Sequence, residues 1–130
     1  MAWRGKRPTS FSLQVKADAE KLIKDIAMDT VQGLMVSSPV MDGVYRASHV
    51  AAINRTSNAT NQASSTAPKG SIDPQAFSEA ARAIIPFKLG NTIHISNSLP
   101  YAMALENGHS GQAADGVYRV VFNYICQKYV

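Results

Sequence analysis

One long helical pattern constrains the fold of this chain more than any other feature of its sequence. Between Leu13 and Val36 the apolar residues recur three and four positions apart, and the charged residues fall mainly on the other side. The apolar positions are Val15, Ala19, Leu22, Ile23, Ile26, Ala27, Val31 and Leu34. Ser10 or Ser12 is a suitable N-cap. Pro39 ends the helix, because proline disfavours helical backbone in the residue before it.

Weaker patterns divide the rest of the chain into short elements. In the first half we expect a turn at 40–43 and a strand at 44–54. A helix from Asp73 that ends before Pro86, a strand at 92–97 and a short helix at 100–107 follow. The last segment, 117–130, begins as a strand and ends ambiguously between strand and helix. The fold class is therefore α+β. A long N-terminal amphipathic helix packs on a small, mostly antiparallel β-sheet, with one or two short additional helices.

The length and charge distribution indicate one domain that carries a basic arm. The chain has 130 residues and a net charge of +4, and Arg4, Lys6 and Arg7 account for most of the excess. We expect an N-terminal basic arm at 1–10 and a single domain at 11–130. Within the domain, residues 55–72 are polar and nearly uncharged, which predicts a long flexible loop.

Several protein classes are disfavoured by composition. The single cysteine, Cys126, cannot form an internal disulfide, so an oxidising compartment is not required. The N-terminus lacks the apolar segment of a signal peptide. No apolar run approaches the roughly 20 residues that span a bilayer. We therefore expect no membrane partner.

The residue types that carry enzyme or metal chemistry are present but poorly spaced. The candidates are Glu106, His109, Ser110 and Gln112, with His94 and Cys126 elsewhere. There is no second closely spaced His/Cys pair for zinc. Adjacent residues such as His109 and Ser110 rarely point at each other, and no nucleophile motif occurs. We expect no enzymatic activity, no cofactor and no metal; hydrogen bonding that fixes a loop, or docks it to a neighbour, is the expected role.

The segment from Asn97 to Gly116 is the most unusual part of the sequence. It reads N-S-L-P-Y-A-M-A-L-E-N-G-H-S-G-Q-A-A-D-G and holds three of the chain's eight glycines. Glycine at this density indicates backbone geometry that side chains would forbid. A loop constrained in this way usually presents a surface to a partner.

This segment, continued through V-Y-R-V-V, resembles a pattern in tailed-bacteriophage neck or tail-completion proteins, approximately N-x-x-P-Y-A-x-x-(L/I)-E-x-G-x-S-x-Q-A-P-x-G-(M/V)-x-R. The chain departs from the pattern at Ala114, where the family commonly has proline. Upstream, S-P-V-M-D-G-V-Y-R-A-S at 38–48 is similar to the family's S-P-V-D-T-G-x-L-R-x-S, with Met41-Asp42 in place of Asp-Thr. The two motifs occur in the family's order, and the resemblance spans about residues 11–125.

The resemblance implies a structural virion protein at the head–tail junction, assembled in the cytoplasm of the host bacterium. Such a protein forms a ring with copies of itself, six in number, around the channel through which the genome passes. Its partners are the adjoining head-closure or connector ring and the tail-terminator or tail-tube ring, with non-specific contact to genomic DNA. The implied interaction residues are Pro39, Gly43, Arg46, Asn97, Pro100, Tyr101, Glu106, Gly108, Ser110, Gln112 and Gly116.

Two alternatives remain open from the sequence. A tail-terminator subunit proper is close to the first interpretation. A small DNA-binding protein that uses Arg4, Lys6 and Arg7 belongs to another class, and a steep salt dependence of binding would reveal it. The near balance of charge outside the arm argues against the second alternative.

Overall fold

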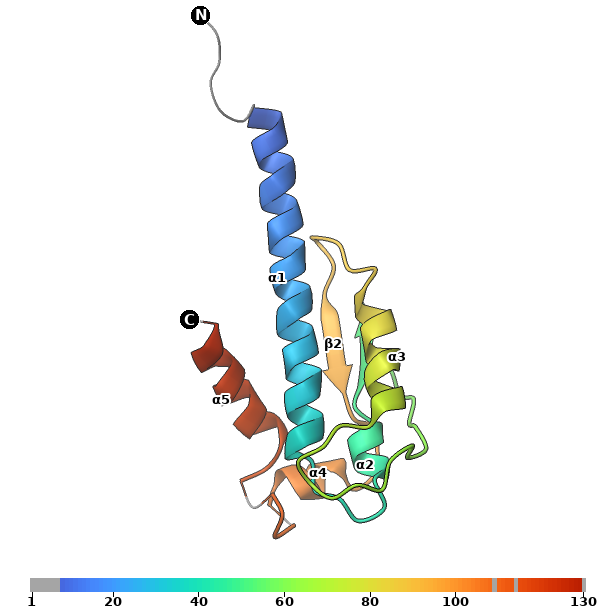
Figure 1. The fold of residues 1–130 in the computed structure, drawn as a ribbon. Coiled ribbons are helices and arrows are strands. Elements are labelled where there is room, and N and C mark those ends of the chain that lie inside the picture. The colour runs from blue at the N-terminus through green and yellow to red at the C-terminus, as the bar shows by residue number, and fades with distance from the viewer. Residues whose placement is uncertain (1–7, 109, 114, 130) are drawn as a thin grey trace, which may run out of the picture.

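The computed structural model describes residues 8–108, 110–113 and 115–129 of the chain. Its elements are α1 (Pro8–Ser37), α2 (Val44–Ala47), β1 (Val50–Ile53), α3 (Pro74–Ile84), β2 (Ile93–Ser96), α4 (Ala102–Glu106) and α5 (Tyr118–Lys128), as Figure 1 shows. This arrangement confirms the predicted α+β class, with a long N-terminal helix and a small antiparallel sheet.

The first part of the core lies between α1, the sheet and α3. Strands β1 and β2 pair antiparallel, from Val50 opposite Ser96 to Ile53 opposite Ile93. In Figure 1 the strand β2 runs between α1 and α3. The buried residues of this cluster are Ala27, Val31, Met35, Ala47, Ala76, Ala80 and Ile84. Small residues predominate, which lets the helices approach the two-stranded sheet closely.

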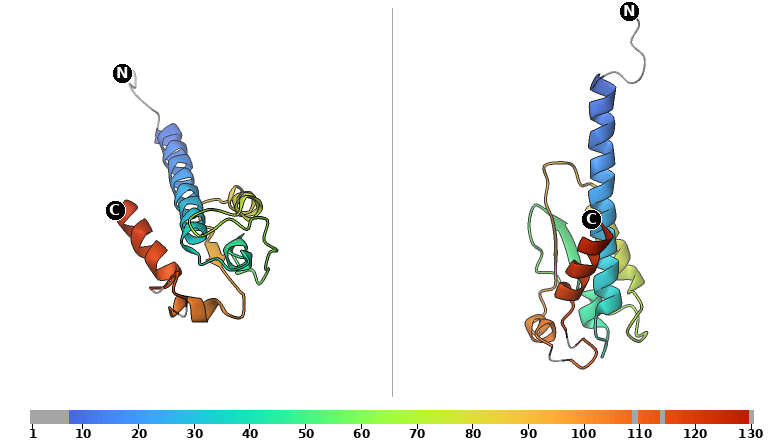
Figure 2. Two further views of the ribbon diagram at one scale, coloured as in Figure 1. Left: turned by 60° about the horizontal axis from the view of Figure 1, so that its bottom comes forward. Right: turned by 90° about the vertical axis from the view of Figure 1, so that its left-hand side faces the viewer.

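The long helix was predicted correctly, but it begins earlier than its apolar pattern suggests. Because α1 starts at Pro8, the suggested N-caps Ser10 and Ser12 lie inside the helix, and the last three residues of the predicted arm are helical. Residues 1–7 of that arm lie outside the described part of the chain. The C-terminal half of α1 contributes Ala27, Val31, Leu34 and Met35 to the core, whereas the N-terminal half projects beyond the body of the protein (Figure 2). Its side chains Leu13 and Leu22 are 69% and 51% exposed.

The strand predicted at the start of 117–130 is wrong, because this segment forms helix α5. Its residues alternate in part, and valine and tyrosine favour strands locally. However, Val117, Val121 and Ile125 also lie four residues apart, on one helical face. That face packs on α1, where a Cβ added to Gly33 would lie 3.1 Å from a methyl group of Val121. The packing of this apolar face on α1 outweighs the local preference for strand.

The strand predicted at 44–54 is only partly correct. Residues Val44–Ala47 form the single turn of α2, and the strand is confined to Val50–Ile53. Tyr45, Arg46 and Ala47 are all buried. A strand with one solvent-facing side would bury alternate residues. The three consecutive buried side chains instead point in different directions around the helical turn and enter different parts of the interior.

The other predicted elements are confirmed. Asp73 caps α3 by accepting the N–H of Ala76 at 3.1 Å, with Pro74 in the first helical position. Strand β2 and helix α4 fall inside the ranges predicted for them. The segment 55–72 contains no helix or strand. No helix of the described residues is long and apolar enough to cross a membrane.

Candidate docking site

The two sequence motifs meet at one end of the molecule. Pro39 and Gly43 of the upstream motif line a hollow of about 390 Å³ together with Tyr101, Ser110 and Gln112 of the downstream motif. The hollow lies where the turn after α1 faces α4 and the glycine-rich segment that follows α4 in the sequence. Five of the eleven residues named from the sequence therefore border one cavity.

Gln112 joins the two motifs directly. Its side-chain Oε1 accepts the N–H of Val40 at 2.9 Å, and its Nε2 donates to the carbonyl of the same residue at 3.1 Å. This pairing imitates two backbone bonds of a sheet between segments 72 positions apart. The backbone of Gln112 is itself fixed, because its N–H donates to Ser110 Oγ at 3.2 Å and its carbonyl accepts from the Lys69 ammonium. The downstream loop is thus held in position against the upstream turn.

Glu106 fixes the other end of the downstream motif. Its carboxylate accepts the backbone N–H groups of Val117 and Tyr118, each at 2.8 Å, and that of Arg119 at 2.9 Å. These are unpaired donors of the first turn of α5, so the carboxylate acts as a cap from outside the helix. Partial burial opposes ionisation, but the three N–H groups and the charge of Arg119 still hold the pKa of Glu106 below its usual value.

Gly116 permits this cap to form. Its φ of +87° is unfavourable for side chains, and an added Cβ would lie 2.6 Å from the carbonyl oxygen of Glu106. Any larger residue would push α4 away from the start of α5. Gly108 also has a positive φ, of 84°, just after α4 ends.

Asn97 and the two residues before α4 complete the downstream motif. The side-chain amide of Asn97 donates to the carbonyl of Tyr45 at 2.9 Å and accepts the N–H of Leu99 at 3.2 Å. Pro100 is exposed, and Tyr101 is 43% exposed with its ring centroid 6.4 Å from that of Tyr45. Asn97 is therefore structural, whereas Pro100 and Tyr101 face solvent.

Arg46 of the upstream motif organises the polar segment 55–72 from inside the protein. Its guanidinium is fully buried and donates to the carbonyl oxygens of Ser65 (2.9 Å), Ala67 (2.8 Å) and Pro68 (3.3 Å), and to Ser71 Oγ (3.0 Å). It takes part in neither of the ion pairs that the described residues form. This side chain holds the second half of the segment for which the sequence predicts a long flexible loop.

Asp73 and Gly43 hold the same segment from two other sides. The carboxylate of Asp73 accepts the backbone N–H groups of Ser64 at 2.8 Å and Ser65 at 3.2 Å, in addition to capping α3. Burial opposes its ionisation, but these N–H groups and the Ser64 hydroxyl lower the pKa of Asp73. Gly43 has φ +84°, and a Cβ there would lie 2.7 Å from the carbonyl of Ser65.

A buried hydrogen-bonded chain, which sequence reasoning missed, connects three elements behind the hollow. The Tyr118 hydroxyl lies 2.9 Å from His49 Nδ1, His49 Nε2 lies 2.7 Å from Ser38 Oγ, and that hydroxyl donates to the Leu34 carbonyl at 2.5 Å. Since the serine proton goes to Leu34, Nε2 carries the imidazole proton and Tyr118 donates to Nδ1. Burial lowers the pKa of His49 to about 3, so the ring is neutral. No residue spacing in the sequence indicates this series of hydrogen bonds.

The chemistry available to these groups is limited by their burial. Ser38 and His49 have the residue types of a nucleophile and its base, but both have no exposed surface. The Ser38 proton is already donated to a backbone carbonyl, so the arrangement joins α5 to the connection between α2 and β1 and to the end of α1, rather than presenting a nucleophile. Among residues 8–108, 110–113 and 115–129, no cluster of three His, Cys, Asp or Glu side chains is placed to hold a metal ion. His109 lies outside the described residues.

Comparison of the chain with protein-family models, with curated proteins and with solved structures gives no match. The geometry of the two motifs, and the surfaces that they leave exposed, are therefore what points to a function.

Proposed function

We propose that this protein is a structural subunit of a tailed-bacteriophage virion, located in the neck or tail-completion ring at the head–tail junction. It acts by docking to other proteins and carries out no chemical reaction. The observation that supports this most is the Gln112–Val40 pairing. Val40 and Gln112, which belong to the two motifs that resemble the phage family, are 72 positions apart, yet the motifs form one braced unit, as expected if they were parts of a single docking surface.

The distribution of exposed apolar side chains supports the same proposal. Met41, at the edge of the hollow, is fully exposed, and Met103 on α4 is 70% exposed. Tyr101 of the downstream motif also lines the hollow and is 43% exposed. Exposed methionine and tyrosine around a preformed hollow are typical of interface centres rather than of free surfaces. We assign this end of the molecule to contact with an adjoining head-closure, terminator or tail-tube ring.

The decisive experiment locates the protein in particles. Antibodies against the purified chain, applied to phage particles from the source and viewed by electron microscopy with gold label, should mark the head–tail junction. A phage that lacks the gene should accumulate filled heads and separate tails. Normal tailed particles without the gene product, or particles that never contain it, would exclude the proposal.

A point variant tests the docking end separately. Tyr101→Ala removes an exposed ring and should reduce the yield of joined particles at least tenfold without changing the thermal unfolding midpoint. Ile85→Ala is the matched control, because Ile85 is 66% exposed but lies at the end of α3, away from the hollow. Equal yields for the two variants would show that the hollow is not the docking end.

A further inference from the structure

Helix α1 carries a β-branched apolar residue followed three positions later by an aspartate twice along one side, with a third residue four positions further on in each case. Ile26, Asp29 and Gly33 form the first trio, and Val15, Asp18 and Leu22 form the second trio, eleven residues earlier. Eleven residues are close to three whole turns, so the two trios lie on the same side of the helix, about 16 Å apart.

Helix α5 and the residue after it contact Asp29 and Gly33 of the first trio. Val121 packs on Gly33, the Lys128 ammonium pairs with the Asp29 carboxylate at 2.8 Å, and the Tyr129 hydroxyl donates to the same carboxylate. The contact therefore has two parts: an apolar side chain that packs on the glycine of α1, and a cation that pairs with the aspartate.

No segment of the described residues covers the second trio in this way. Val15 is 50% exposed, Leu22 is 51% exposed, and Asp18 is exposed between them. Figures 1 and 2 show this part of α1 projecting beyond the end of α5. It is an apolar face with a carboxylate at its edge.

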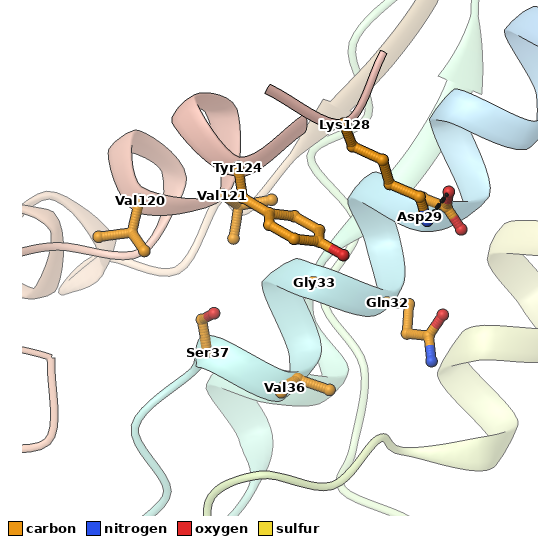
Figure 3. A pocket seen from close by; sticks show the side chains of 9 residues that line it. All are labelled: Asp29, Gln32, Gly33, Val36, Ser37, Val120, Val121, Tyr124 and Lys128. Atoms are coloured by element: carbon orange, nitrogen blue, oxygen red, sulfur yellow. Dashed lines mark hydrogen bonds and ion pairs between the residues drawn. The ribbon is translucent and has the colours of Figure 1, made fainter. Parts of the chain in front are cut away.

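Helix α5 carries a surface whose apolar residues and cation could complement the second trio. A groove of about 410 Å³ lies between α1 and α5 (Figure 3), and one wall is the row Val120, Tyr124 and Lys128, spaced four residues apart. Val120 and Tyr124 are 42% and 54% exposed. The Lys128 side chain is 44% exposed despite its ion pair, so its ammonium retains free donors. Helix α5 contains two basic residues and no acidic one.

These two surfaces cannot meet within one molecule. The second trio and the α1 wall of the groove lie on the same helix, and a rigid helix keeps Leu22 and Asp29 roughly 10 Å apart along its axis. A second copy can bring them together. The trio carries the Asp18 carboxylate, and the groove carries the Lys128 ammonium, which pairs with Asp29 on one side but remains 44% exposed to a second carboxylate.

We propose that the Val15/Asp18/Leu22 face of α1 docks into the α1–α5 groove of a second copy of this chain. Val15 and Leu22 lie against Val120 and Tyr124, and Asp18 shares the Lys128 ammonium with the neighbour's Asp29. The contact joins two different surfaces, so it propagates head to tail and closes when the rotation per subunit allows a ring. The inference rests on the proposed function for the ring and on these residues for its interface.

The first test compares assembly of two charge-introducing variants. Leu22→Glu places a carboxylate in the proposed contact and should raise the concentration of half-assembly at least tenfold, measured by analytical ultracentrifugation of the full chain. Ile85→Glu is the control, because it introduces the same charge at a 66% exposed apolar residue elsewhere. Circular dichroism spectra should show both variants folded. A monomeric wild-type chain at every concentration, or equal assembly of the two variants, overturns the proposal.

The second test identifies which surfaces meet. Cys126 is exposed and is first replaced by serine. Leu22→Cys and Tyr124→Cys are then made on separate chains and mixed under mild oxidation. The proposal expects the mixed disulfide to form at least tenfold faster than either homodimer, and faster than with Ile85→Cys as the partner of Tyr124→Cys. Preferential Leu22–Leu22 crosslinks would show that two α1 faces pair instead, which contradicts the proposal.

These results are independent of the test of function. Tenfold weaker assembly of Leu22→Glu in a protein that never enters a virion would support the interface and exclude the phage role. A protein found at the head–tail junction whose Leu22→Glu variant assembles normally would support the role and exclude this interface.

Discussion

Glu106 surrounds Gly116 on two sides. Its carbonyl oxygen lies 2.6 Å from the place that a Cβ on Gly116 would occupy, and its carboxylate passes beyond that glycine to accept the first N–H groups of α5. One residue at the end of α4 therefore determines both where the chain turns and where the next helix begins. The position of α5 on α1 depends on this contact as well as on its apolar face.

Removing the carboxylate should destabilise the protein. Glu106→Ala leaves three N–H donors without a protein partner, and we expect a loss of about 2 kcal/mol in the free energy of unfolding, near the upper range for helix caps. Glu106→Gln keeps the acceptor oxygen but loses the charge, so its loss should be smaller, about 1 kcal/mol. Urea unfolding measures both.

An exposed glutamate provides the control for this series. Glu79→Ala on α3 should change the free energy of unfolding by less than about 0.5 kcal/mol. A Glu106→Ala protein as stable as the Glu79→Ala protein would mean that the cap contributes nothing in solution.

A single methyl group at position 116 should have a larger effect than the same change at another positive-φ glycine. Gly116→Ala introduces strain and a clash with the Glu106 backbone, and we expect a loss of about 3 kcal/mol. Gly90 also has a positive φ, of 97°, but open space surrounds its missing Cβ, so Gly90→Ala should cost about 1 kcal/mol. Thermal unfolding of the two variants tests the difference, and equal midpoints would contradict it.

Stability should fall as the pH drops through the range in which His49 titrates in the unfolded chain. Burial lowers the pKa of His49 to about 3 in the folded protein, whereas the unfolded value is near 6.5. Between these values the unfolded state binds the additional proton. The free energy of unfolding therefore decreases by up to about 1.4 kcal/mol for each pH unit below 6.5.

The window from pH 6.5 to 5 separates this effect from the carboxylates. Glu106 and Asp73 have lowered pKa values, so their contribution is lost only at lower pH. His49→Gln should be less stable than wild type at pH 7 but should lose about 2 kcal/mol less between pH 6.5 and 5. Parallel slopes for the two proteins in urea unfolding would show that His49 does not carry the dependence.

Loss of the buried guanidinium should release the segment 55–72. Arg46→Met leaves the carbonyl groups of residues 65, 67 and 68 without their donor, and we expect a loss of about 3 kcal/mol with faster trypsin cleavage after Lys69. Arg82→Met on the exposed side of α3 is the control and should change neither quantity. Cleavage at the wild-type rate would show that other contacts hold the segment.

The sequence predicted the elements whose signals are local. The periodicity of α1 and the Asp73-Pro74 start of α3 are properties of neighbouring residues, and both are confirmed. The start of the helix at 118–128 was predicted as a strand, and its end was left open between strand and helix, because its β-favouring residues form a helix only when Val121 packs on α1 and Glu106 caps the first turn. Those partners are distant in sequence, so no local pattern contains them.

The candidate site also contains residues that local sequence patterns predicted and residues whose roles depend on distant partners. The motif residues Glu106 and Gln112 were expected to hold a loop by hydrogen bonds, and the structure supplies their partners. Nothing in the sequence indicated that Arg46 would be buried without an acidic partner, or that His49 would connect Ser38 to Tyr118. Both depend on which side chains the fold brings together from separate segments.

The absence of a side chain at Gly33 has a mechanical consequence. Val121 touches α1 at this point, with its methyl group 3.1 Å from the position of the missing Cβ, so the size of residue 33 sets the angle between the two helices. From Gly33 to Pro8 the helix extends roughly 37 Å, and a tilt of about 10° would swing its tip by roughly 6 Å. Adding one methyl group at residue 33 would therefore change the angle between α1 and α5, and the length of α1 would turn that small change into a displacement of several ångströms at its far end.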